Sequence, residues 1–168
     1  MMDAIGSTSA VMTCASRGTW QMLEVLMPYV ANSSDLDNKS LVGTNNAAVH
    51  IAAENSGDGD HKLGVLLDAG ANIERRNYWG YTPLLHAIVR VQLLKTVQVL
   101  LDRGADTEAR TATGYTALHE AGVHDQVDSA RILLKHGADK DAKTSGGHGV
   151  LTFGSNDFKE QLKRHTVS

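Results

Sequence analysis

Histidine has the widest range of chemistry among the side chains of this sequence, and there are eight histidines. His119 and His124 lie five residues apart and are followed by Asp125, all three being residue types that bind zinc. Two histidines that bind zinc from one helix are four residues apart, so this spacing does not fit that motif. We interpret the pair as surface residues and predict no metal site.

The candidate nucleophiles lack the sequence patterns that would activate them. The single cysteine, Cys14, lies beside Val11 and Met12 in an apolar stretch, which predicts a buried and inert thiol. No serine stands in a G-x-S-x-G turn, and the glycine-rich segment 146–149 lacks the lysine of a phosphate-binding loop. We predict no catalytic residue, no cofactor and no enzymatic activity. An enzyme that uses the histidine-rich surface is the alternative.

The composition is close to that of an ordinary globular domain, with 42% apolar and 21% charged residues. At 168 residues the chain is long enough for one domain with its own core. The net charge of -3 argues against a general nucleic-acid or anionic-membrane binder. The sequence has no membrane-spanning apolar run, no signal-peptide pattern and no cysteine pair, so we expect a soluble cytoplasmic protein, with the nucleus as the alternative.

The elements that position these residues follow an internal repeat. Three segments align: LLDAGANIE ending at Glu74, LLDRGADTE ending at Glu108 and LLKHGADKD ending at Asp141. Each segment contains a glycine, at Gly70, Gly104 and Gly137. Ten residues after each of these comes a second glycine, at Gly80, Gly114 and Gly147. Self-similarity at such a fixed period predicts an array of small repeated units.

Two further segments, in register with these glycines, resemble the ankyrin repeat. Thr82-Pro83-Leu84 and Thr116-Ala117-Leu118-His119 are similar to the T-P-L-H-x-A motif of that family. Fainter copies lie at 47–52, with His50 in the motif histidine position, and at 9–14 and 149–152. The resemblance covers nearly the whole chain. It implies an all-α solenoid of about five helix–turn–helix units with β-hairpin fingers and degenerate terminal caps.

The same resemblance implies how the chain is divided. We predict a single ankyrin-repeat domain over 1–168. Its parts are an N-terminal capping repeat at 1–39, internal repeats at 43–76, 77–110 and 111–143, and a C-terminal capping repeat at 144–168. The extra residues between Val30 and Ala47 predict a longer, polar first finger.

Local signals predict where the helices begin and end. Thr82 and Thr116 are suited to cap the N-termini of helices, and Gly104 and Gly137 fit left-handed caps at the C-termini. The runs with leucines at helical spacing are Lys95–Asp102 and Ser129–Lys135. In the last helix Asp157 and Glu160 are spaced as a capping pair, with Phe158 and Leu162 facing inward.

The finger positions supply the candidates for binding. Four residues before each second glycine stands a cation: Arg76, Arg110 and Lys143. Trp79 has no counterpart in the other repeats, and large amphipathic rings beside arginine are typical of binding hot spots. The predicted partner-binding residues are Arg76, Tyr78, Trp79, Tyr81, Arg90, Arg110, Thr113, Tyr115 and His124.

Each of these features also has a structural interpretation. Tyr81 and Tyr115 could pack against neighbouring fingers instead of a partner. The row of cations could pair with the acidic residues two positions earlier, which are Glu74, Glu108 and Asp141.

The resemblance implies a non-catalytic protein–protein interaction module that binds on the concave face of its fingers and helices. We expect a monomer whose partner is another protein with an acidic surface, and neither nucleic acid nor a membrane. The alternative is a regulatory or targeting ankyrin domain of a larger enzyme or signalling protein.

Overall fold

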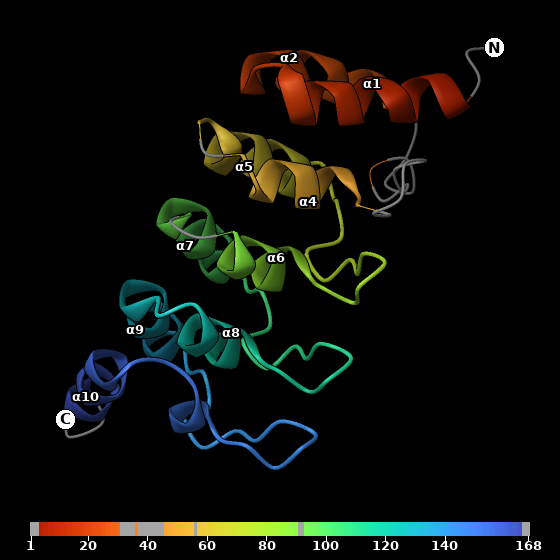
Figure 1. Ribbon diagram of the computed structural model, residues 1–168. Helices are drawn as coiled ribbons and strands as arrows, with labels where there is room; N and C mark the ends of the chain where they lie inside the picture. Colours follow the sequence, from red (N-terminus) through yellow and green to blue (C-terminus); the bar gives the residue numbers. More distant parts are fainter. Residues whose placement is uncertain (1–3, 31–35, 37–45, 56, 91–92, 166–168) are drawn as a thin grey trace. The chain divides into compact units, whose positions relative to one another are not determined.

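The computed structural model describes residues 4–30, 36, 46–55, 57–90 and 93–165, and these form helices joined by turns (Figure 1). The chain divides into two compact units, Met1–Pro83 (unit 1) and Leu84–Ser168 (unit 2). The described residues contain no strand, and the only bridge between extended residues there joins Lys143 to Gly149. The all-α part of the predicted fold is confirmed. None of the described helices is long and apolar enough to cross a membrane.

Unit 1 contains two helix pairs. The first pair is α1 (Ala4–Arg17) and α2 (Trp20–Leu26), with a 3-10 turn η1 (Met27–Tyr29) after it. The second pair is α4 (Ala48–Ala53) and α5 (Gly59–Asp68). As Figure 1 shows, α1 lies against α4 and α2 against α5. The core between the pairs is aliphatic, and its fully buried residues include Val11, Leu23, Leu63 and Leu66.

Unit 2 continues the alternation of short helices, and α6 begins at the boundary residue. Its helices are α6 (Pro83–Val89), α7 (Leu94–Asp102), α8 (Ala117–Val123), α9 (Val127–Lys135) and α10 (Asn156–His165). A 3-10 turn, η2 (Val150–Thr152), replaces the first helix of the last repeat. Helix α9 packs between α7 and α10, and α8 packs on η2. This is the truncated final repeat that the motif at 149–152 predicts.

Helices α5, α7 and α9 end in the same way, because a glycine in the left-handed conformation follows each of them. Gly70, Gly104 and Gly137 have φ angles of 92°, 83° and 86°. After α7, Gly104 donates its N–H to the Leu101 carbonyl, and the next residue donates to the Leu100 carbonyl. This is the Schellman pattern, and α5 and α9 end with the corresponding bonds. The predicted C-terminal caps are confirmed.

The cap of α10 differs from its prediction. Ser155 precedes the helix, and its Oγ accepts the Phe158 N–H at 3.2 Å, so Ser155 and not Asp157 is the capping residue. Glu160 instead pairs with Lys163 at 3.2 Å. The inward positions are confirmed, because Phe158 and Leu162 are buried.

Two predictions about the N-terminal region have other outcomes. Cys14 is half-buried and not buried, because in the described part of unit 1 only one side of α1 is covered by another helix pair. The longer first finger predicted between Val30 and Ala47 falls almost entirely outside the described residues.

Candidate functional site

Three five-residue turns with the same hydrogen bonds precede α6, α8 and η2, which we call the inner helices, and we call these turns the finger turns. They are Asn77–Tyr81, Thr111–Tyr115 and Thr144–His148. In each, the first N–H donates to the fifth carbonyl and the fourth N–H donates to the first carbonyl. For the first turn these bonds are 3.0 and 3.1 Å long. The predicted β-hairpin fingers are therefore closed turns in the described structure, not paired strands.

The first side chain of each finger turn closes it a second time. Asn77 Oδ1 accepts the N–H of Tyr81 at 3.0 Å. Threonine hydroxyls do the same in the other two turns, at 3.1 and 3.2 Å. The fourth residue is a glycine with φ between 77° and 81° in all three, a backbone that other residues rarely adopt. Positions one, four and five thus hold the turn.

A motif histidine supports the fifth residue of the next finger turn. His50 Nε2 lies 2.9 Å from the Tyr81 carbonyl, and His119 Nε2 lies 3.3 Å from the His148 carbonyl. On the other side of each ring, Nδ1 accepts a backbone N–H at 3.3 Å. The acceptor role of Nδ1 places the proton of a neutral ring on Nε2. The interpretation of His119 as a surface residue is wrong, because its ring is fully buried beneath the turn, and this burial lowers its pKa.

The first finger turn is also held by a hydrogen bond between two buried side chains. Buried Asn77 donates its side-chain N–H to the side chain of buried Asn46 at 3.0 Å. Sequence reasoning missed both asparagines, although Asn77 stands at the start of a turn, where this residue type is favoured. The bonds to Asn46 and His50 make the first finger turn a rigid platform on unit 1.

Two aromatic rings stand on this platform. The Tyr78 side chain is exposed, and Trp79 is 49% exposed, with the ring centroids 6.2 Å apart in an edge-to-face arrangement. Arg76 lies beside them at the surface and donates from Nη1 to the Gly80 carbonyl at 2.7 Å. The structure therefore brings together three predicted residues on the turn, with Tyr81 half-buried at its base, and a fourth, Arg76, directly before it.

The second finger turn uses its predicted residues within the protein. Arg110 Nη1 donates to the Gly114 carbonyl at 3.1 Å and to the Lys143 carbonyl at 2.7 Å, which ties two successive repeats together. Tyr115 is half-buried, and its ring centroid lies 5.1 Å from that of Phe153. Thr113 remains exposed at the tip. The packing interpretation thus describes Tyr115.

The two arginines of the row of cations are held by carbonyl groups in the bonds just described. Two of the acidic residues proposed as partners of the row bond elsewhere. Glu108 Oε1 accepts the Asp139 N–H at 2.9 Å. Asp141 pairs with Lys140 at 3.0 Å.

Arg90 and His124 do not join the finger turns. Each follows the last residue of its inner helix, whereas the turns lie before the first residue. For α8 this separation is about 10 Å, the length of seven helical residues. His124 Nε2 instead lies 3.9 Å from Glu120 Oε2. Burial raises the pKa of Glu120, and the charge of a protonated His124 opposes that rise.

In the described parts of the chain, the finger turns present aromatic, cationic and hydroxyl side chains at the surface. Within those ranges no three His, Cys, Asp or Glu side chains gather in a way that could hold a metal ion. At the finger turns these surface residues are the aromatic pair with Arg76 and, in unit 2, the exposed tip residue Thr113.

Comparison with known proteins gives the family. A family model of ankyrin repeats, in three copies, matches residues 49–144, which is more than half of the chain. No curated protein matches the sequence. The matched region includes α5 to α9 and all three left-handed helix caps. The chain therefore belongs to the ankyrin repeat family.

Proposed function

We propose that this protein is a non-catalytic interaction module that binds a protein partner through the first finger turn. Ankyrin repeats are generally protein–protein interaction modules, and the family is typically non-catalytic. One observation carries the proposal: Trp79 keeps about half of its surface exposed, next to exposed Tyr78. An exposed indole makes little contribution to folding, so its role is best explained by a partner.

The rigidity of the turn favours binding. Trp79 and Tyr78 are held on a backbone fixed by Asn77 and by the His50 bond to the carbonyl of Tyr81. A pre-organised aromatic pair loses little conformational freedom when a partner covers it. Such rings are the usual anchors of interface hot spots.

The proposal includes the nature of the partner and the place of the site. Arg76 puts a positive charge beside the aromatic pair, which favours a partner with an acidic surface. The finger turns and inner helices of ankyrin stacks line a concave face, and we place the site there, with binding by a single copy of the chain. We propose the cytoplasm as its location.

Trp79→Ala tests this proposal. We expect a loss of at least about 2 kcal/mol of binding free energy, roughly thirtyfold in affinity, because a hot-spot anchor is removed. The free energy of unfolding should change by only about 0.5 kcal/mol, since half of the ring is already in water. The full chain serves as bait, cross-linked partners are identified by mass spectrometry, and calorimetry measures affinity for each variant.

The matched control is Tyr29→Ala, which removes another exposed ring of unit 1 outside the finger turns. It should leave partner affinity unchanged, and Arg76→Ala should slow association at low salt. A large loss of stability in Trp79→Ala with unchanged partner affinity would show that the indole is a structural residue.

A further inference from the structure

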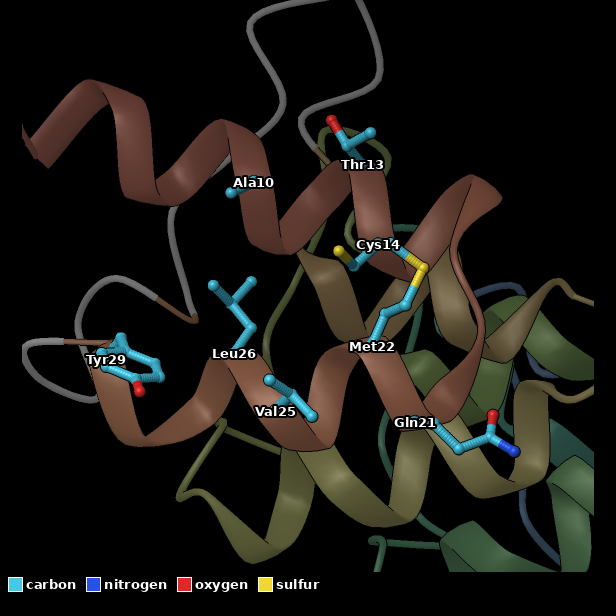
Figure 2. Close-up of a pocket in the computed structure, with 8 residues that line it drawn as sticks. All are labelled: Ala10, Thr13, Cys14, Gln21, Met22, Val25, Leu26 and Tyr29. Atoms are coloured by element: carbon cyan, nitrogen blue, oxygen red, sulfur yellow. The ribbon is translucent and has the colours of Figure 1, made fainter.

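The described surface outside the finger turns includes an apolar groove and a charged contact. The groove lies between α1 and α2 of unit 1 and is lined by side chains such as Cys14, Met22 and Val25 (Figure 2). Its lining is mainly apolar and fits any apolar occupant. The charged contact lies in unit 2 between the ends of α7 and α9, where His136 meets Asp102. The atoms around this histidine define its protonation state, so the contact specifies its own chemistry.

Both ring nitrogens of His136 lie closest to groups that only accept hydrogen bonds. Nδ1 lies 2.9 Å from the Ile132 carbonyl oxygen, one turn earlier in α9. Nε2 lies 3.2 Å from Asp102 Oδ1 at the end of α7. A neutral imidazole has one N–H and one lone pair, so it can donate to only one of these acceptors. The two bonds form together only when the ring carries two protons, and the geometry is therefore that of an imidazolium.

The position of His136 also favours a positive charge. It is the C-terminal cap of α9, where the partial negative charge of the helix end attracts cations. Counted from the cap glycine, the same position one repeat earlier in the sequence is Arg103, and Asp68 corresponds to Asp102. The two repeats thus share an acid and a cation at these positions, but histidine alone can lose its charge between about pH 5 and 8. The side chain is 23% exposed, so its proton can exchange with solvent.

A neutral partner for the ring lies beside the carboxylate. Gln98 Nε2 donates to Asp102 Oδ1 at 2.7 Å and lies 3.5 Å from His136 Nε2. The amide has two N–H groups, so the second can donate to the Nε2 lone pair after the ring loses a proton. Hydrogen bonds from Gln98 and His136, together with the charge of Lys135, hold the pKa of Asp102 below its usual 3.8. The carboxylate is therefore ionised wherever a histidine titrates.

The other charged residues around α9 do not bond to this ring. Helix α9 also packs on α8 and α10, and among their described residues no charged side chain bonds to His136. On α8, Glu120 lies beside His124, and on α9 itself Asp128 pairs with Arg131. The remaining described charged residues of the helices packed on α9 are Lys95 on α7 and Asp157, Lys159, Glu160, Lys163 and Arg164 on α10.

We propose that His136 is a pH-dependent clamp between α7 and α9. In mildly acidic conditions the imidazolium donates to Asp102 of α7 and to the Ile132 carbonyl of α9, which ties two successive repeats by a charged hydrogen bond. As the pH rises and the ring releases its Nε2 proton to solvent, the weaker neutral bond from Gln98 replaces it. The ends of α7 and α9 are thus held more tightly below neutral pH. This clamp is independent of the finger-turn site.

Nitrogen-resolved NMR of the full chain, from about pH 4.5 to 9, follows the ring of His136, whose signal is assigned by its loss in His136→Gln. Asp102→Asn should move the titration midpoint to lower pH by at least roughly 0.3, because the carboxylate that stabilises the charged ring is removed. Asp128→Asn is the matched control, since it removes an exposed carboxylate of the same helix that pairs with Arg131, and it should leave the midpoint unchanged. Equal midpoints in the wild type and Asp102→Asn, or equal shifts in both variants, would overturn the proposal.

Thermal melting of His136→Arg tests whether the proton controls the clamp. Arginine keeps its charge at every pH used, so only the wild type loses the charged bond. Between about pH 5.5 and 8.5 the melting midpoint of the wild type should fall by about 1–2 °C relative to that of His136→Arg. This divergence should disappear when both chains also carry Asp102→Asn. A difference between wild type and His136→Arg that stays constant with pH, or one that persists without Asp102, would contradict the clamp.

Discussion

Two glycines with the same backbone angle have different surroundings. Gly104 and Gly114 have φ angles of 83° and 81°. A Cβ at Gly104 would have no heavy atom within 4 Å, whereas one at Gly114 would lie 2.5 Å from the backbone nitrogen of Ser145. The next finger turn therefore approaches Gly114 closely. Gly114 is therefore required both by its backbone angle and by the close contact with Ser145, whereas Gly104 is required by its backbone angle alone.

This difference predicts unequal costs for the same substitution. Gly104→Ala should lower the free energy of unfolding by about 1 kcal/mol, the cost of a left-handed alanine. Gly114→Ala should lower it by about 3 kcal/mol, since the turns must also move apart. Urea denaturation of both variants measures this difference. Equal losses would mean that the two turns separate without resistance.

At the scale of the helix, an ion pair stands at the start of α5, and its carboxylate also bonds to the first residue of α2. Lys62 is only 2% exposed, and its Nζ lies 2.9 Å from Asp58 Oδ1. Asp58 Oδ2 also accepts the Trp20 N–H, at 3.1 Å. Burial raises the pKa of Asp58, but the hydrogen bond and charge of Lys62 outweigh it and hold the pKa below its usual 3.8.

Removing one partner should therefore be worse than removing both. Asp58→Ala should lower the free energy of unfolding by about 3 kcal/mol, because it leaves a buried ammonium without its counter-charge. Adding Lys62→Met should recover most of that loss. Chemical denaturation of the single and double variants measures both effects, and a double variant no more stable than Asp58→Ala would contradict this account.

The pH dependence provides the control for the ion pair. The folded pKa of Asp58 is depressed, so its contribution to stability is present above the unfolded pKa and is lost as pH falls through the folded value. The wild type should lose this contribution below pH 3.8, and Asp58→Ala should lack it.

The helices could be predicted where the signal is local. Leucines at helical spacing followed by Gly104 or Gly137 specify a helix and its end within a few residues. The N-terminal cap of α10 could not be predicted in this way. Ser155 and Asp157 are both residue types that cap helices, and the residue at which the helix begins decides between them. Lys62 was missed since its burial depends on Asp58 and α2.

At the scale of the whole molecule, each repeat protects its neighbour. Removing residues 150–168 deletes α10 and with it Phe158 and Leu162, which cover α9. We expect the shortened chain to aggregate, because repeats are stabilised by their adjacent interfaces. Light scattering after size-exclusion chromatography measures this, with deletion of 163–168 as the control that keeps both buried residues. A soluble shortened chain with an unchanged melting midpoint would contradict the capping role.

The site could be predicted only where its residues are contiguous. Tyr78 and Trp79 share one turn, so finding the turn also located both rings. The internal roles of Arg110 and Tyr115 arise from contacts with Lys143 and Phe153, more than thirty residues away. Such contacts between repeats leave no local trace in the sequence.

The construction of the finger turns has a consequence for how the repeats can diverge after duplication. The bonds that hold each turn come from positions one, four and five, so side chains at positions two and three are not needed to form it. Those two positions are Tyr78 and Trp79 in the first turn, Ala112 and Thr113 in the second, and Ser145 and Gly146 in the third. Selection can therefore change the tip of one repeat from small to aromatic without a large loss of folding stability. Inherited copies of one turn thus become separate sites of variation, and new specificity arises by side-chain replacement on an unchanged backbone.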